Sequence, residues 1–206
     1  MDESLSFGTL GSRCCGVTNL FDVPSTEIDI IAGSLSNSLG SAGGFCAGDK
    51  NIVDHQVLSS QAYCYSASLP AFLAAAAVVN LQTLSSSGNE ISHSLSENTK
   101  TLRKEFTPYP AHMELLGSNN SPLLYLAFNE NYDCDHSKQR SILNLIVKDM
   151  KDNNKVLLTL FTSVEKDEKI KHRPMIKIAV SAGFGTEQVR SFSAQLRKSA
   201  NKFIKN

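Results

Sequence analysis

The polar stretch at residues 85–89, Ser-Ser-Ser-Gly-Asn, separates two parts of the chain with different patterns, and this limits the folds open to it. Before it, glycines punctuate short extended runs. After it, segments of helical and of strand character alternate. Because clustered serine, glycine and asparagine are typical of loops, the stretch predicts a domain boundary. One domain is expected at residues 1–87 and a second at residues 88–206.

The first part predicts two extended segments followed by helices. A short acidic and apolar run at residues 27–31 predicts a strand, and residues 45–48 predict a second, buried extended segment. Residues 51–60 have helical character. Pro70 stands where the first turn of a long alanine-rich helix begins, a position that tolerates proline. This helix is expected to end near Ser85.

The second part predicts a compact α+β domain, because helices and strands mix over a length that one small domain occupies. The predicted helices lie at residues 91–106, 137–151 and 186–204, and the predicted strands at residues 123–128, 156–161 and 175–180. In the middle helix, apolar residues recur near helical spacing at Ile142, Leu143, Leu145, Ile146 and Met150.

Composition argues against several functional classes. The 20 basic and 20 acidic side chains cancel, so nothing in the charge indicates a nucleic-acid-binding face. The longest apolar run, residues 69–81, is interrupted by Pro70 and is shorter than the roughly 20 residues that cross a bilayer, so no membrane span is expected. The 5 cysteines fit no metal-binding pattern, which favours reduced thiols.

No metal site is expected either. The 5 histidines show no metal-ligand spacing. Asp133, Asp135 and His136 cluster in the sequence, but the surrounding residues indicate a polar loop before a helix.

Four stretches in a fixed order carry more information than any of them alone. Taken singly, glycine- and serine-rich stretches permit a phosphate site, although turn glycines are the commoner explanation. The four stretches are residues 2–11 (DESLSFGTLG), 30–40 (IIAGSLSNSLG), 43–45 (GGF) and 65–70 (YSASLP). Together they resemble the α-oxoamine synthases, which use pyridoxal phosphate to condense an amino acid with an acyl-CoA. Within that family the sequence is most similar to the first, long-chain-base subunits of serine palmitoyltransferase.

The resemblance implies an α/β fold, namely the C-terminal part of a fold-type-I pyridoxal-phosphate transferase. It would comprise a remnant of the large domain and a small α+β C-terminal domain. The first half of the large domain, and any N-terminal membrane anchor that relatives carry, would then be missing.

The resemblance also implies roles for residues near the cofactor. Asp2 matches the aspartate that pairs with the pyridine nitrogen, which lets the ring act as an electron sink. Leu5 stands where active members carry a ring-contacting histidine, and Asn37 stands at the Schiff-base lysine position. An amide nitrogen is not a nucleophilic amine, so catalytic residues are expected to be absent here. Ser34 is expected to be a cofactor-binding residue, and Lys50 lies outside the motif.

Two further residues are assigned by the same resemblance. Ser66 lies in the segment that, in family dimers, reaches the cofactor phosphate on the other subunit, where it would donate a charge-assisted hydrogen bond. The alternative is that Ser66 caps the alanine-rich helix. Lys177 falls at the family's substrate-carboxylate arginine, but lysine lacks the bidentate fork of arginine. A strand residue with a solvated tip is the favoured alternative for Lys177.

The implied function is that of a non-catalytic subunit of serine palmitoyltransferase, an acyltransferase, in sphingolipid biosynthesis. The complex would condense L-serine with palmitoyl-CoA to 3-ketodihydrosphingosine at the cytosolic face of the endoplasmic reticulum membrane. The catalytic second subunit would complete a heterodimer and hold pyridoxal 5'-phosphate covalently. The alternative is a regulatory or decoy module that binds the catalytic subunit without supporting activity, while Asn37 argues against an independent pyridoxal enzyme.

Overall fold

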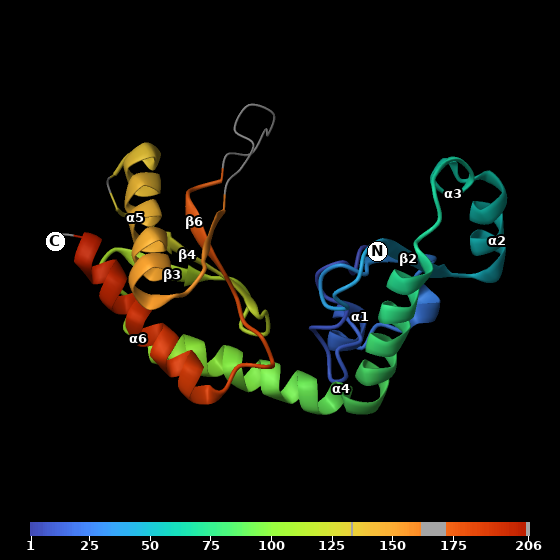
Figure 1. Cartoon of the computed structure of the whole chain (residues 1–206), viewed down its shortest axis with the longest axis horizontal. Coiled ribbons are helices and arrows are strands. Elements are labelled where there is room, and N and C mark those ends of the chain that lie inside the picture. The colour runs from blue at the N-terminus through green and yellow to red at the C-terminus, as the bar shows by residue number, and fades with distance from the viewer. Residues whose placement is uncertain (133, 162–171, 205–206) are drawn as a thin grey trace. The chain divides into compact units, whose positions relative to one another are not determined.

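The computed structural model describes residues 1–132, 134–161 and 172–204. The chain divides into two compact units, Met1–Ser94 and Leu95–Asn206 (Figure 1). The first unit contains α1 (Val17–Leu20), the 3-10 turn η1 (Ser25–Glu27), β1 (Ile30–Ser34), β2 (Gly44–Gly48), α2 (Lys50–Ser59), α3 (Gln61–Tyr65) and the start of α4 (Ala71–Phe106). The second unit contains the end of α4, then β3 (Met113–Leu116), β4 (Leu123–Phe128), α5 (His136–Asn154), β5 (Thr159–Phe161), β6 (Met175–Ala179) and α6 (Thr186–Phe203).

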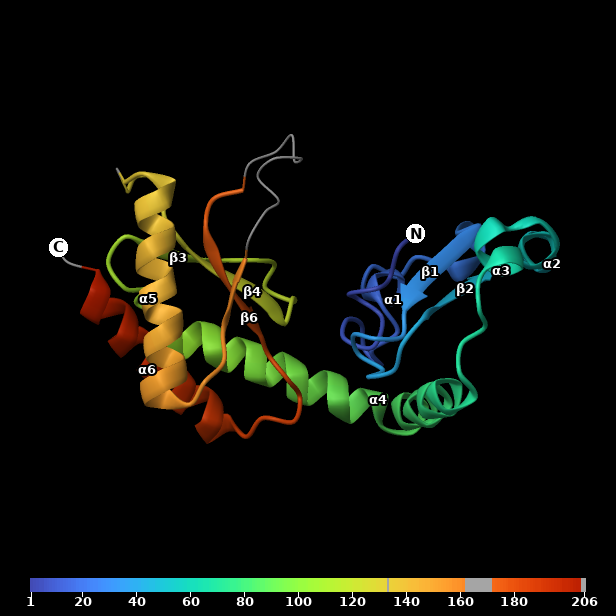
Figure 2. The same ribbon diagram turned by 45° about the horizontal axis from the view of Figure 1, so that its top comes forward.

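The first unit is built around an antiparallel hairpin of β1 and β2, which can be followed in Figure 2. Asp2 forms a parallel bridge with Ala32, which places the start of the chain beside β1. The buried core of this unit is small. It consists of Leu35, Leu39 and Ala77, packed against Phe7, Phe45, Leu69 and Leu84.

The predicted strand positions in this unit are close to those observed, but the expected burial of residues 45–48 is wrong. In β2 only Phe45 is partly buried, and the other strand residues are exposed. The described residues place β2 in a two-stranded sheet with β1 as its partner. A sheet of two strands covers little of either face, so the apolar character of the segment did not translate into burial.

Helix α4 is one continuous helix of 36 residues, and the loop expected at residues 85–89 is not there. The boundary between the two units falls inside this helix, at Ser94 and Leu95. Gly88 and Ser92 are packing positions on the helix instead of loop residues. A Cβ on Gly88 would meet the backbone oxygen of Arg13 at 2.7 Å, and Ser92 Oγ donates to the Gly11 carbonyl at 2.7 Å. The small residues allow a loop to pack against the helix.

The second unit has a four-stranded antiparallel sheet in the order β3-β4-β6-β5. One face of the sheet packs against α4, α5 and α6 (Figure 1). Burial alternates along β3, whereas consecutive residues are buried at the end of β4 and at the start of β6. Its fully buried members include Phe106, Leu126, Ile146, Ile176 and Leu196.

The sequence predicted most elements of the second unit. The strand at residues 123–128 is confirmed by β4, and the helices at 137–151 and 186–204 correspond to α5 and α6. Strand β5 is shorter than predicted. Strand β3 was missed, because four residues with a glutamate at an outward position, Glu114, give little alternation.

Both α5 and its cap follow from local sequence. The Asp135 carboxylate accepts a hydrogen bond from the Ser137 N–H at 3.1 Å, and the helix ends at Asn154, followed by Lys155 in the left-handed conformation with φ 59°. No helix in the part of the chain that the structure describes is long and apolar enough to cross a membrane.

Candidate functional site

The motifs at the start of the chain and after β1 lie together in the first unit. Asn37 Nδ2 donates to the Ser4 carbonyl at 2.7 Å, and Ser38 Oγ donates to the Phe7 carbonyl at 2.7 Å. These two side chains tie the loop after β1 to the segment that carries the expected cofactor contacts. The fold therefore brings the two stretches together, although they lie about thirty residues apart in sequence.

Asp2 is exposed, and its carboxylate accepts the Ser4 N–H at 2.8 Å. Hydrogen bonds from Ser4 hold the pKa of Asp2 below its ordinary value. The carboxylate is therefore ionised at neutral pH. An exposed, ionised and fixed carboxylate has the properties that pairing with a protonated ring nitrogen requires.

Glu3 is the residue that the sequence analysis missed. It is 1% exposed, and its carboxylate accepts the backbone N–H groups of Val17 at 2.9 Å and Thr18 at 3.2 Å, together with the Ser6 hydroxyl. Burial opposes ionisation, but the hydrogen bonds outweigh it and lower the pKa of Glu3. Glu3 thus anchors the backbone next to Asp2. Its main partners are backbone amides, which carry no signal in the sequence.

The loop after β1 offers hydroxyls and an amide, but no amine. Ser34 Oγ lies 2.7 Å from Ser36 Oγ and accepts the Ser36 N–H at 3.1 Å. Asn37 is exposed, and its amide already donates to Ser4. The sequence has no lysine before Lys50, and Lys50 is the first residue of α2.

These residues fit only part of what a pyridoxal-phosphate site needs. Asp2 suits the ring nitrogen, and Ser34 supplies a hydroxyl at the end of β1. Covalent attachment does not fit, because a Schiff base requires a free amine and Asn37 has none. Leu5 is 66% exposed and has no group that could transfer a proton to the ring.

Ser66 follows the last residue of α3, and its hydroxyl donates back to the Ala62 carbonyl. The alternative that it caps the alanine-rich helix is wrong, because α4 begins at Ala71 and the Leu73 N–H donates to the Pro70 carbonyl. Ser66 lies in an exposed segment together with Tyr65, which is 87% exposed.

Lys177 lies in the second unit, on β6, and is exposed. Its register partners are Tyr125 on β4 and Thr159 on β5. It lines a cavity of about 720 Å³. Its exposed side chain agrees with the alternative of a strand residue with a solvated tip. The residue is also part of the lining of this cavity.

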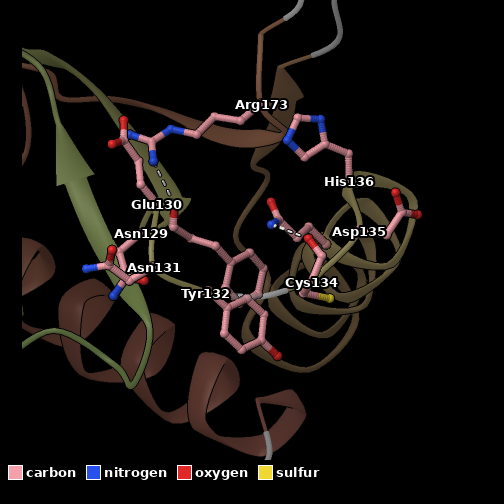
Figure 3. A pocket seen from close by; sticks show the side chains of 10 residues that line it. Asn129, Glu130, Asn131, Tyr132, Cys134, Asp135, His136 and Arg173 are labelled. Atoms are coloured by element: carbon pink, nitrogen blue, oxygen red, sulfur yellow. Dashed lines mark hydrogen bonds between the residues drawn. The ribbon is translucent and has the colours of Figure 1, made fainter.

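A second cavity of about 670 Å³ lies where β4 leads into α5 (Figure 3). Its basic side chain, Arg173, is already engaged, because it pairs with Glu114 at 2.8 Å and donates to the Phe128 carbonyl at 2.9 Å. The Asp135 carboxylate caps α5. The described residues include no group of three side chains that could hold a metal ion. Asp133, considered with Asp135 and His136 above, lies outside the described residues.

Comparison with known proteins gives a consistent result. Residues 6–196 match the family described as aminotransferase class I and II. The chain is 32% identical over 200 residues to long chain base biosynthesis protein 1c of Oryza sativa subsp. japonica, covering 97% of this chain and 41% of that protein. It is 32% identical over 209 residues to serine palmitoyltransferase 1 of Dictyostelium discoideum, covering 99% of this chain and 43% of that protein.

Solved structures agree on the fold. A structure described as SPT with PLP internal aldimine superposes with a TM-score of 0.81 at 17% identity, covering 98% of this chain and 47% of that one. The chain therefore has the fold of part of these enzymes. It spans about two-fifths of the length of the curated relatives that it matches.

Proposed function

Because this chain belongs to the aminotransferase class I and II family, we propose that it serves as a non-catalytic subunit of serine palmitoyltransferase. The complex condenses L-serine with palmitoyl-CoA to 3-ketodihydrosphingosine, the first step of sphingolipid synthesis. The similarity to first-subunit relatives over 97–99% of this chain supports the subunit type. The subunit would act at the cytosolic face of the endoplasmic reticulum membrane.

One observation carries the proposal. Asn37 stands at the Schiff-base position, and its amide is used to tie the loop after β1 to the Ser4 carbonyl. The framework of a cofactor site is thus kept while the attachment chemistry is lost. Pyridoxal phosphate supplies an electron sink when it is bound. A catalytic partner, the second subunit, would hold it covalently.

Exposed large apolar side chains of the first unit support the existence of such a partner. Leu58 is 79% exposed, Tyr65 is 87% exposed and Phe72 is 73% exposed. Large apolar side chains that a folded domain leaves in solvent are often buried by a protein partner. The same side chains would also serve a regulatory or decoy module that binds the catalytic subunit without supporting activity.

Co-purification with a catalytic second subunit separates these functions. A complex in which this chain raises the condensation rate, or the amount of stably folded partner, supports the subunit. A complex that forms but lowers the rate below that of the partner with its own first subunit supports the decoy. Absence of a complex at micromolar concentrations contradicts both.

Ser66 and Lys177 test the finer assignments within the same complex. If Ser66 donates to the partner's cofactor phosphate, Ser66→Ala removes a hydrogen bond to a charged group, worth about 1.5–3 kcal/mol. Ser66→Phe should weaken cofactor binding further, because its bulk would also intrude on the cofactor. If Lys177 binds the carboxylate of serine, Lys177→Met should raise the KM for serine and leave the affinity for the cofactor unchanged.

A further inference from the structure

The cavity where β4 leads into α5 has mostly polar walls (Figure 3). Its volume of about 670 Å³ falls within the range of roughly 300–1,000 Å³ that ligand pockets occupy. Apart from Phe128, the lining residues carry polar groups, and they are Asn129, Glu130, Asn131, Tyr132, Cys134, Asp135, His136, Gln139 and Arg173. Walls of this kind suit a short polar ligand better than a hydrocarbon chain, because a polar group needs a hydrogen-bond partner when it is covered.

Hydrogen bonds and stacked rings hold these walls in place. The Asn129 N–H donates to the His112 carbonyl at 2.8 Å, and the Tyr132 N–H donates to the Asn129 carbonyl at 3.1 Å. The ring of Tyr132 stacks on Phe128 and on His112, with centroid distances of 4.8 Å in both cases. The walls are therefore fixed before a ligand enters, which lowers the entropy cost of binding.

The cavity contains amide oxygens that can accept hydrogen bonds from a ligand. Asn129 Oδ1 is buried and has no hydrogen-bond partner among the described residues. Gln139 is 6% exposed, and its Nε2 donates to the Cys134 carbonyl at 2.8 Å, which leaves Gln139 Oε1 as an acceptor. A buried acceptor without a donor costs free energy. A ligand with N–H donors would remove this cost.

The charges of the lining favour a cation. Glu130 and Asp135 are exposed, and in the part of the chain that the structure describes neither carboxylate forms a salt bridge. Arg173 adds no net charge, because it pairs with Glu114 at 2.8 Å. Figure 3 shows Asn129 and Glu130 on one side of the cavity and Asp135 on the other. An anion would meet carboxylates on both sides, whereas a cation would be attracted to both.

We propose that this cavity binds a short aliphatic diamine in its doubly protonated form. One ammonium group donates to Asn129 Oδ1 and the Glu130 carboxylate, and the other donates to Gln139 Oε1 and the Asp135 carboxylate. An ammonium group has three N–H donors and no acceptor, so oxygen atoms on both sides suit it. A metal ion is a poorer match, since the described residues include no group of three side chains that could hold one.

The proposed diamine site is separate from the residues that the resemblance assigns to cofactor and substrate. Lys177 does not line this cavity, and the segments of Asp2 and Asn37 belong to the first unit. The diamine site therefore stands apart from the proposed function.

Calorimetric titration of the whole 206-residue chain, carried on a solubility-enhancing fusion, tests the site. The probe is the five-carbon diamine cadaverine at low ionic strength, and the signal of the fusion partner alone is subtracted. Saturable binding of one cadaverine per chain, about tenfold tighter than that of the diol of equal chain length, supports the proposal. No saturable binding, or equal binding of the diol or of the dicarboxylate of equal length, overturns it.

L-Serine is the competitor that separates this site from the proposed function. It carries an ammonium group, but its carboxylate would be repelled by Glu130 and Asp135, so it should not displace cadaverine at equal concentration. Displacement by serine contradicts the diamine site and leaves the subunit assignment standing. Failure of the chain to form a complex with a catalytic subunit would contradict the subunit assignment and leave cadaverine binding unchanged.

Variants at Asn129 and Glu130 test which oxygen atoms bind the diamine. Asn129→Leu removes the buried amide oxygen, and Glu130→Gln removes one carboxylate while keeping its shape. Each should bind cadaverine about tenfold more weakly, because a hydrogen bond or an attraction to a charged group is lost. Far-ultraviolet circular dichroism confirms that each variant is folded.

The matched controls make the same chemical changes on α5 outside the cavity. Asn144→Leu and Asp152→Asn alter an exposed amide and an exposed carboxylate that do not line it. Their affinity for cadaverine should stay within about twofold of that of the unchanged chain, because exposed charges contribute little. Equal weakening in the controls, or unchanged binding in folded Asn129→Leu and Glu130→Gln variants, overturns the proposal.

Discussion

The two units of this chain bury their apolar residues to very different extents. The second unit has one continuous core, in which a sheet packs against three helices and residues such as Leu126 and Ile146 are fully buried. In the first unit the buried cluster is Leu35, Leu39 and Ala77, while residues such as Tyr65 and Phe72 are exposed. Burial of apolar area drives folding, so we expect the second unit to be the more stable of the two.

This difference agrees with the proposal that the chain is one subunit of a larger complex. The first unit contains the segments that we propose for the cofactor site and exposed apolar side chains such as Tyr65 and Phe72, which a partner would bury in our proposal. The second unit contributes a folded domain with its own cavity. Four substitutions test this difference between the two units and the contacts on which it depends.

The largest effect is expected in the core of the second unit. Leu126→Ala removes a fully buried side chain from a core that cannot collapse around the gap, and should cost about 3–5 kcal/mol of unfolding free energy. Leu39→Ala, in the small cluster of the first unit, should cost less, because fewer neighbours lose contacts. Hydrogen exchange resolved by peptide measures each unit separately. Equal costs in the two units would contradict the comparison.

The next effect concerns Gly88 in α4. In a freely exposed helix, glycine to alanine stabilises by about 1 kcal/mol. Here a Cβ at position 88 would meet the Arg13 carbonyl oxygen at 2.7 Å, so Gly88→Ala should destabilise the first unit, by about 1–3 kcal/mol. Asn89→Ala, at an exposed neighbour, is the control and should be neutral or stabilising. Faster labelling of the buried Cys14 thiol reports the opening of this contact.

The third effect is a pH dependence of the first unit that arises from Glu3. The pKa of Glu3 is lower in the folded chain than its ordinary value of 4.5. The folded state therefore gains stability that is present above the unfolded pKa and is lost as the pH falls through the folded pKa. Cys14 labelling, measured as the opening equilibrium at each pH, should increase below about pH 4.5. In Glu3→Gln this acid-induced increase should be greatly reduced, and an unchanged profile would contradict the role of Glu3.

The smallest effect is expected at Asn37. Asn37→Ala removes one exposed hydrogen bond and should cost no more than about 1 kcal/mol of stability in the first unit. It should leave the condensation rate of the proposed complex nearly unchanged, because no covalent role belongs to Asn37. A loss of activity as severe as loss of the partner's lysine would show that the assignment of the catalytic subunit is wrong. Borohydride treatment with pyridoxal phosphate should label no specific residue of this chain alone.

Much of the second unit could be predicted because its pattern is local. Strand β4 is a short continuous apolar run, helices α5 and α6 show the apolar spacing of half-buried helices, and Asp135 is a recognisable cap. The four-residue strand β3 could not be predicted, because it is specified by pairing with β4. The segments of Asp2 and Asn37 lie together as the motifs suggested, whereas the cofactor and substrate roles of Asp2, Ser34, Ser66 and Lys177 stay predictions.

The order of the motifs and the absence of an amine at Asn37 are evident from residue identity, which alone decides whether a Schiff base can form. The continuation of α4 through residues 85–89 and the burial of Glu3 became evident from the folded structure. The reason is the same in both cases. Gly88 is close to the Arg13 carbonyl, and Glu3 accepts the N–H groups of Val17 and Thr18. These contacts join residues distant in sequence through backbone atoms, which are the same at every position and leave no pattern to read.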